Sequence, residues 1–298
     1  MNVQKLLEKA LRREDLSIEE GNFLYTHASL SALMYTANEI RKTYRPDNVV
    51  TWIIDRNINI TNVCISRCTF CNFHKLINQE GTYITQLDEY SEKIRELEAC
   101  GGNQLLIQGG MHPQLGIDFY AQLFTSLKQR HPLIKLHALG PPEIAYIAQR
   151  EHMAYADVLR TLLNAGMDSL PGAGAEILQD HIRAKVSPGK CNTQTWLDVM
   201  HEAHKIGIVT SATMMYGHIE TIADRMAHLV LIRDLQYKKP SHSKGFTAFI
   251  PWPFYSKNTK LAQQTGKSYP IQHLEYIRMI AMSRIMLTNI DNIQASWL

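Results

Sequence analysis

The sequence has 298 residues, of which 45% are hydrophobic and 20% are charged, a composition that fits a globular protein with one large core. Its formal charge of +3, from 31 basic and 28 acidic residues, lacks the basic excess of a nucleic-acid-binding protein. The sequence contains neither an apolar run of about 18 residues nor the apolar segment of a signal peptide, so we expect a cytoplasmic protein with no membrane or nucleic-acid partner.

The first 45 residues predict a helical extension. The segment LLEKALRR has a helical period, and Ser17 followed by Glu20 has the spacing of a capping box that begins a second helix. We therefore predict two units, a helical extension over residues 1–45 and an α/β domain over residues 46–298.

After Pro46, short runs rich in β-branched residues alternate with longer amphipathic segments. The predicted strands cover residues 49–60, 104–109, 134–139, 167–172, 208–216, 246–252 and 292–297. The predicted helices lie near residues 86–100, 118–130, 142–164, 176–185, 194–206, 221–237 and 272–288. This alternation predicts parallel strands with right-handed crossovers, and seven strands of one type favour a (β/α) barrel over a doubly wound sheet.

The predicted barrel does not close. Its seventh strand ends at Trp297, one residue before the last residue of the sequence, so an eighth strand cannot be built. We expect a barrel that is open or incomplete at the C-terminus. The seventh strand should then present an unpaired edge, which lowers stability and favours aggregation.

Three of the five cysteines, Cys64, Cys68 and Cys71, lie within eight residues directly after the first predicted strand. In a reducing compartment such a group indicates metal or redox chemistry rather than disulfides. Three thiolates can each hold one iron of a 4Fe–4S cluster, whereas most such clusters use four cysteines. Three ligands leave one iron open to an amine and a carboxylate of another molecule.

The spacing of these cysteines alone also allows a zinc site or three unrelated core residues. A zinc site would need a fourth ligand, for which His74, Cys100 and Cys191 are candidates. The CxxxCxxC spacing, the aromatic Phe70 before the last cysteine and the barrel context favour the cluster over both alternatives.

The cysteine motif resembles that of the radical S-adenosylmethionine superfamily. Further segments are similar to the dehypoxanthine futalosine cyclase family of the futalosine route to menaquinone, and this likeness extends from about residue 16 to the last residue. These segments are DRNINITNVC, LIQGGMHP, GPPEI, DSLPGAGAEIL, PGKC, TSATMMYGHIET, GFTAFIPW and NIQASW. Aminofutalosine synthase and the tyrosine-using subunit of deazaflavin synthase are related families. Trp252 favours the cyclase over these two.

The resemblance implies that two strand ends, together with Phe70, bind S-adenosylmethionine. Gln108, Gly109 and Gly110 end the second strand, where they would meet the amino group of the cofactor; alternatively, this is a tight turn that simply needs glycine. Glu176 would bind the ribose hydroxyls, or else it only favours the positive end of a helix that begins there. Ala173 stands where the family has glycine, which costs about 1 kcal/mol if that position needs a positive φ.

Polar residues at the end of the fifth strand are candidates for the catalytic groups. Tyr216, His218 and Glu220 lie together there and could contact substrate or move a proton. The alternative is that His218 and Glu220 cap the following helix.

Substrate-binding residues are expected on the first and sixth strands. Asp55, Asn57 and Asn59 alternate with apolar residues and therefore share one face of the first strand. Such a row belongs in a substrate cavity, because an outward row buried against helices would need its own polar partners. Trp252 is the candidate on the sixth strand.

The resemblance implies a radical cyclisation. A 5′-deoxyadenosyl radical would take hydrogen from the ribose C4′ of dehypoxanthine futalosine, and the ribose radical would attack the benzoate ring. The implied cofactors are a 4Fe–4S cluster with three cysteine ligands and S-adenosylmethionine, and the implied partner is an electron donor such as a flavodoxin or ferredoxin. The alternatives are a sister radical enzyme, or a shortened cluster-binding protein without turnover.

Overall fold

The computed structural model describes residues 1–267, 269–270 and 272–296, and its centre is a parallel sheet. Seven strands lie side by side in the order of the sequence and curl into a half-barrel, which confirms the predicted open α/β barrel. The strands are β1 (Asp55–Asn59), β2 (Gln104–Gln108), β3 (Lys135–Ala138), β4 (Ser169–Leu170), β5 (Val209–Tyr216), β6 (Phe246–Pro253) and β7 (Asn292–Ile293).

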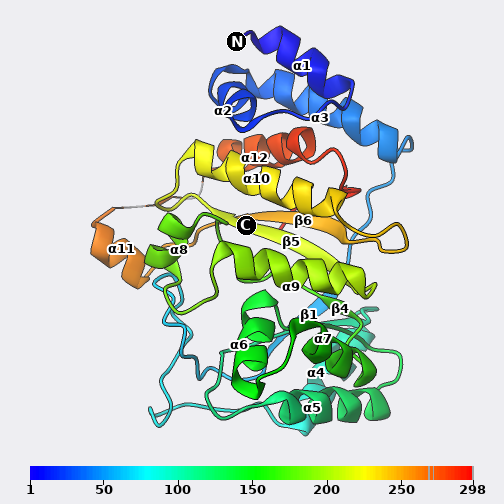
Figure 1. Ribbon diagram of the computed structural model, residues 1–298, viewed down its shortest axis with the longest axis vertical. Helices are drawn as coiled ribbons and strands as arrows, with labels where there is room; N and C mark the ends of the chain where they lie inside the picture. The colour runs from blue at the N-terminus through cyan, green and yellow to red at the C-terminus, as the bar shows by residue number, and fades with distance from the viewer. Residues whose placement is uncertain (268, 271, 297–298) are drawn as a thin grey trace.

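Helices cover the outer face of the half-barrel (Figure 1). They are α4 (Leu87–Ala99), α5 (Ile117–Arg130), α6 (Pro141–Glu151), α7 (Tyr155–Asn164), α8 (Asp180–Val186), α9 (Thr193–Lys205), α10 (Ile222–Tyr237) and α12 (His273–Met286). The short helix α11 (Lys260–Thr265) lies to one side, at the left of Figure 1. Helices α4 to α7 lie at one end of the long axis, and α10 and α12 lie toward the other.

The alternation of burial along β2 separates the two faces of the sheet. Leu105 and Ile107 are fully buried against the helices, whereas Gln104, Leu106 and Gln108 point to the opposite, concave face. We call this concave face the lumen. Parallel pairing in register places residues of neighbouring strands on the same face, so the lumen face can be followed from β1 to β6.

The N-terminal extension consists of α1 (Val3–Leu11), α2 (Ile18–His27) and α3 (Leu30–Tyr44). The predicted capping box is present, because the Ser17 hydroxyl accepts from the Glu20 backbone N–H while the Glu20 carboxylate accepts from the Ser17 N–H. Helices α2 and α3 pack on α10 and α12, more than 180 residues later in the sequence, at the top of Figure 1.

The first predicted strand is shorter than expected. Only Asp55–Asn59 pair with β2, and the preceding residues 49–54 are extended but unpaired, with Val50 and Trp52 largely exposed. β1 begins only at Asp55 because its partner strand, β2, begins at Gln104, the residue that pairs with Asp55. The last strand is also shorter, and its predicted end at residue 297 lies outside the described residues.

Two predicted helices were wrong in their limits, and one helix was missed. Residues 142–164 form two helices because His152 adopts a left-handed conformation, with φ of 53°, that ends α6. The predicted helix over residues 176–185 begins only at Asp180. The short helix α11 was not predicted.

No helix in the described ranges is long and apolar enough to cross a membrane.

Candidate functional site

The three clustered cysteines lie on a loop that follows the carboxyl end of β1. Cys64 and Cys68 are buried and Cys71 is half-buried. The Ser66 hydroxyl lies 2.9 Å from the Cys64 sulfur and 3.4 Å from the Cys68 sulfur, so it ties two of the thiols together. Burial raises the pKa of Cys68.

The loop is held by backbone hydrogen bonds to two later segments. The Ile65 N–H donates to the Met111 carbonyl at 3.1 Å, and the Met111 N–H points at the Cys64 sulfur at 3.4 Å. On the other side, the Thr69 N–H donates to the Val186 carbonyl at 2.8 Å. The loop is therefore fixed between the end of β2 and the end of α8.

Position 110 requires glycine because the cysteine loop leaves no room for a side chain there. A Cβ on Gly110 would overlap the Val63 carbonyl group and lie 2.8 Å from the Cys64 Cβ. Neither Gly109 nor Gly110 has a positive φ, so backbone freedom is not what the turn requires. The turn after Gln108 allows the cysteine loop to pack directly on the end of β2.

A buried group of charges lies beside Cys68. The Lys190 ammonium is 2.7 Å from the Glu176 carboxylate and 5.6 Å from the centre of the Phe70 ring. Burial raises the pKa of Glu176, but the positive charge of Lys190 outweighs burial and holds that pKa below its usual value. The same ion pair keeps the pKa of Lys190 high despite burial.

Glu143, at the beginning of α6, faces the same lysine. Burial raises its pKa to about 7, and Oε2 of Glu143 is buried without a hydrogen-bond partner among the described residues. The Lys190 ammonium thus interacts with two carboxyl groups. A buried carboxyl oxygen without a partner is costly, so this position favours a ligand that brings a donor.

Glu176 does not begin a helix. It lies in a turn with φ of 44°, and α8 begins only at Asp180. The expectation that Glu176 favours the end of a helix is therefore wrong, and the carboxylate is placed by its ion pair instead. Ala173 does not have a positive φ, whereas Gly174 does, at 72°, so alanine causes no backbone strain at position 173.

Arg183 on α8 positions this charged group. Its guanidinium donates to the Ala175 carbonyl at 2.6 Å and to the Cys191 carbonyl at 3.1 Å. These carbonyls adjoin Glu176 and Lys190, respectively, in the chain. Arg183 therefore sets the two segments that face each other across the ion pair.

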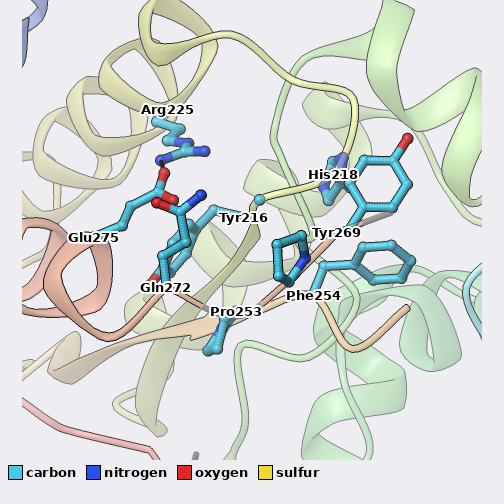
Figure 2. Close-up of a pocket in the computed structure, with 10 residues that line it drawn as sticks. Tyr216, His218, Arg225, Pro253, Phe254, Tyr269, Gln272 and Glu275 are labelled. Atoms are coloured by element: carbon cyan, nitrogen blue, oxygen red, sulfur yellow. Dashed lines mark hydrogen bonds and ion pairs between the residues drawn. The ribbon is translucent and has the colours of Figure 1, made fainter. Parts of the chain in front are cut away.

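Tyr216, His218 and Glu220 come together at the carboxyl end of β5, where Tyr216 and His218 line a cavity of about 230 Å³. Register places Tyr216 and Pro253 on the face toward α10, so this cavity lies behind the sheet rather than in the lumen. Arg225 stacks on the Tyr216 ring at 4.9 Å, and the Tyr216 hydroxyl is buried without a partner in the described part of the chain. Figure 2 shows Arg225 and Glu275 pointing toward each other beside Tyr216, and the Phe254 and Tyr269 rings at the other end.

The Glu220 carboxylate is saturated by internal partners. It accepts from the backbone N–H groups of Gly217 and His218, at 2.5 and 2.8 Å, and from Arg225 at 2.8 Å. Its Oε2 also lies 2.9 Å from Nδ1 of His218, whose Nε2 is 3.1 Å from the Met215 carbonyl oxygen. Burial raises the pKa of Glu220, but His218 and Arg225 outweigh it, and the pKa is well below the usual range.

The polar row of β1 faces the lumen. Arg56 points the other way and forms a 2.9 Å ion pair with Glu96 on α4, while Asp55, Asn57 and Asn59 lie on the concave face. Asp55 and Asn57 are exposed there, and Asn59 is half-buried. Trp252 pairs in register with Met215, which places its half-buried side chain on the same face at the carboxyl end of β6.

Sequence reasoning missed Lys190, Glu143 and Arg225. Lys190 lies in the PGKC segment and Glu143 in GPPEI, two segments that carried the family resemblance but had no residue assigned. A lysine far in sequence from the cysteines carries no local signal of burial, because its partners come from other strand ends. Arg225 follows Glu220 by five residues, a spacing that could have indicated the ion pair.

Beside the cysteines, the donor set contains a buried cation and two carboxyl groups. In the described ranges no three His, Cys, Asp or Glu side chains converge closely enough to hold a single metal ion. The buried cation, the carboxylate and the unpartnered oxygen of Glu143 beside Cys68 match the charged amino-acid end of S-adenosylmethionine. The residues beside the cysteine loop therefore fit a bound S-adenosylmethionine.

A parallel half-barrel with a cysteine loop after its first strand defines the class of radical enzymes that use S-adenosylmethionine and an iron–sulfur cluster. Solved structures agree on the fold: methylornithine synthase PylB has a TM-score of 0.69 at 17% identity, covering 96% of this chain and 77% of that one. The FeFe-hydrogenase maturase HydG from Carboxydothermus hydrogenoformans has a TM-score of 0.74 at 13% identity, with 99% and 66% covered.

The chain belongs to the radical SAM superfamily, whose family model matches residues 58–232, and the model of the CofH/MqnC C-terminal region matches residues 243–298. It is 37% identical to a cyclic dehypoxanthine futalosine synthase from Halalkalibacterium halodurans, covering 100% of this chain and 78% of the relative. It is also 37% identical to a 5-amino-6-(D-ribitylamino)uracil–L-tyrosine 4-hydroxyphenyl transferase from Nostoc sp., with 99% and 78% covered. The chain is therefore a radical enzyme.

Proposed function

We propose that this protein cyclises dehypoxanthine futalosine to its cyclic form in menaquinone biosynthesis, forming a carbon–carbon bond. The observation that carries the proposal is likeness over the whole chain to cyclic dehypoxanthine futalosine synthases, at 37% and 35% identity. Trp252, half-buried on the lumen face, supports it because an indole offers a stacking surface to the benzoate ring of that substrate.

In this proposal Cys64, Cys68 and Cys71 hold three irons of a 4Fe–4S cluster. The bound cluster and S-adenosylmethionine supply the radical that removes hydrogen from the substrate ribose. Lys190 binds the carboxylate of the cofactor, and Glu176, released from its ion pair, accepts from the ribose hydroxyls. Gln108, Gly109 and Gly110 line the amino end, and Phe70 covers Lys190 from the cluster side.

The residues of β1 and β5 take different parts. Asp55, Asn57 and Asn59 contact substrate from the lumen face. Glu220 and His218 act as positioning residues, because their polar atoms are engaged within the strand tip. Tyr216, with its unpartnered hydroxyl in the cavity behind the sheet, is the group there that can still bond a ligand.

The second candidate is the 4-hydroxyphenyl transferase reaction, which the equal identity to that relative supports. The two are separated with reconstituted protein under anaerobic conditions. One assay offers dehypoxanthine futalosine and the other offers 5-amino-6-(D-ribitylamino)uracil with tyrosine, each with S-adenosylmethionine and a flavodoxin or ferredoxin reductant. We expect 5′-deoxyadenosine and cyclised product only in the first. Product only in the second would overturn the proposal.

A further inference from the structure

A hydrogen-bonded group on the lumen face of β3, β4 and β5 is not used by the site described above. Nδ1 of His137 lies 2.7 Å from the Ser169 hydroxyl, and Nε2 of His137 lies 3.5 Å from the Ser211 hydroxyl. The Ser211 hydroxyl in turn accepts from the Gly172 N–H at 3.2 Å. His137 shares its face and its register with Asn57, two strands away.

The partners fix the direction of these hydrogen bonds. Because Ser211 accepts from a backbone N–H, its hydroxyl hydrogen is free to point at Nε2 of His137. Nδ1 then carries the proton and donates to Ser169. Burial lowers the pKa of His137 to about 4, in line with a neutral ring. The Ser169 hydroxyl hydrogen has no other partner among the described residues and remains available to a ligand.

The charge of this face selects the class of ligand. Among the described lumen-facing residues of β1 to β5, the one cation is Lys135, at the first residue of β3, and Asp168 lies 3.3 Å from its ammonium. Asp55 supplies a negative charge nearby. Asp168 also forms an ion pair with Lys128 on α5 at 2.6 Å. The hydrogen bonds of His137 run to the uncharged side chains of Ser169 and Ser211, so the group itself is neutral. Neutral hydroxyl groups, which both donate and accept, match serine, histidine and amide side chains.

We propose that Ser169, oriented by His137 and Ser211, binds the sugar hydroxyls of the substrate on the lumen face, opposite Asn57. The inference deepens the proposed function and rests on it for the ribose of dehypoxanthine futalosine. A ribityl chain offers the same hydroxyl chemistry. His137 is a positioning residue, and Ser169 makes the contact.

The test measures binding by calorimetry to cluster-loaded protein with S-adenosylmethionine. The ligands are dehypoxanthine futalosine and its analogues that lack the 2′- or 3′-hydroxyl. We expect the wild-type protein to bind one analogue about tenfold more weakly, the usual loss for one hydrogen bond. Ser169→Ala and His137→Phe should bind the full substrate about tenfold more weakly and lose the preference over that analogue.

His204 supplies a matched control. It is also buried, its pKa is also lowered to about 4 by burial, and it bonds the Thr210 hydroxyl at 2.8 Å, but it lies on the helix side of β5. His204→Phe should keep the wild-type preference. Should His137→Phe fail to load the cluster, Ser169→Ala, which removes one oxygen atom, decides alone. A preference unchanged in Ser169→Ala would overturn the inference.

The proposed function can fail separately. If the wild-type protein binds only 5-amino-6-(D-ribitylamino)uracil, the cyclase proposal is wrong. The hydroxyl-binding inference then stands if Ser169→Ala weakens that binding about tenfold but leaves binding of a 5-amino-6-alkylaminouracil without hydroxyls unchanged. Binding of neither ligand, or equal weakening of both uracils, overturns the inference.

Discussion

At the scale of single residues, Lys190 is a buried cation that faces two carboxyl groups. Its ammonium neutralises Glu176 at 2.7 Å and lies near Glu143, whose pKa is raised to about 7. A buried ion that loses its partner costs several kcal/mol, whereas removing both members of a pair costs much less. Stability and cofactor binding at Lys190 can therefore be separated.

We predict that Lys190→Met lowers the free energy of unfolding by about 3 kcal/mol, since it leaves Glu176 buried without its cation. The double variant Lys190→Met, Glu176→Gln should recover most of this loss but not the affinity for S-adenosylmethionine. Urea unfolding and equilibrium dialysis of the cofactor check both parts. If the double variant binds the cofactor as wild type does, Lys190 and Glu176 are structural only.

Cluster binding should separate the three cysteines of the motif from the other two cysteines. Cys64→Ala, Cys68→Ala and Cys71→Ala should each abolish cluster binding, because each removes one of three thiolate ligands. Cys100→Ala and Cys191→Ala serve as controls and should load normally, since Cys100 is exposed at the end of α4 and Cys191 bonds Arg183 only through its backbone. Iron and sulfide counts give the result, and a full cluster in any of the first three variants would contradict the assignment.

At the scale of elements, the end of β2 and the cysteine loop behave as one unit. Gly110→Ala should displace the loop and abolish cluster loading, because the added Cβ would overlap the Val63 carbonyl. Gly109→Ala is the matched control, since its Cβ would come no closer than 3.2 Å to Ile60 and Thr61. We expect it to load at least half as much iron as wild type. Equal loading of both variants would show that the loop is not constrained by the turn.

The sequence predicted the type and order of the strands well and their limits less well. Short apolar runs rich in β-branched residues are local and therefore readable from the sequence, so all seven strands were found. Limits depend on the neighbour: residues 49–54 have strand composition but no partner. The left-handed His152 that divides one predicted helix had no glycine to mark it.

The candidate site also has a part that the sequence predicted and a part that depends on contacts distant in the sequence. The cysteine motif is contiguous and was found, whereas Lys190 and Glu143 meet Glu176 only because the ends of β3 and β4 converge with the loop between α8 and α9. The predicted group at the tip of β5 does converge, but Tyr216 faces α10 rather than the lumen. Tyr216 is the last residue of β5, so strand alternation determines its face, whereas His218 and Glu220 follow Gly217, whose φ of 87° turns the chain out of the strand.

The buried Glu220 carboxylate at the tip of β5 makes the stability of the protein depend on pH. Its pKa is below the unfolded value of 4.5, so its stabilisation is complete above pH 4.5 and is lost as the pH falls through the folded pKa. We predict that Glu220→Gln lowers the free energy of unfolding by about 3 kcal/mol at pH 7. The difference from wild type should shrink below pH 4.5. Urea unfolding at pH 7 and pH 4 measures it, and a difference that stays constant would show that the carboxylate charge contributes nothing.

At the scale of the whole molecule, the N-terminal helices and the half-barrel share one interface. The guanidinium of Arg233 on α10 donates to the Leu16 carbonyl at 2.9 Å, and Arg225 donates to the Tyr25 hydroxyl at 3.0 Å. We propose that the extension over residues 1–45 does not unfold separately from the rest, because its buried face is completed by α10 and α12.

Leu24→Ala tests this. Leu24 on α2 is fully buried, and its truncation should lower the free energy of unfolding by about 3 kcal/mol. Circular dichroism and cluster absorbance should lose signal at the same urea concentration, lower than in wild type. The exposed Leu11 gives the control, since Leu11→Ala should change stability by less than about 0.5 kcal/mol. A cluster transition unaffected by Leu24→Ala would show that the extension unfolds independently.

The packing of the first helices on the last ones has a consequence for synthesis on the ribosome. Each βα unit of the half-barrel can dock on the unit made just before it, because the strands lie in sequence order. Helices α1 to α3 are made before the half-barrel, yet α12 is completed only at residue 286. At about 5–20 residues per second they wait roughly 10 to 50 seconds for that partner. During this interval the apolar faces of α2 and α3 are a target for a chaperone that acts on nascent chains.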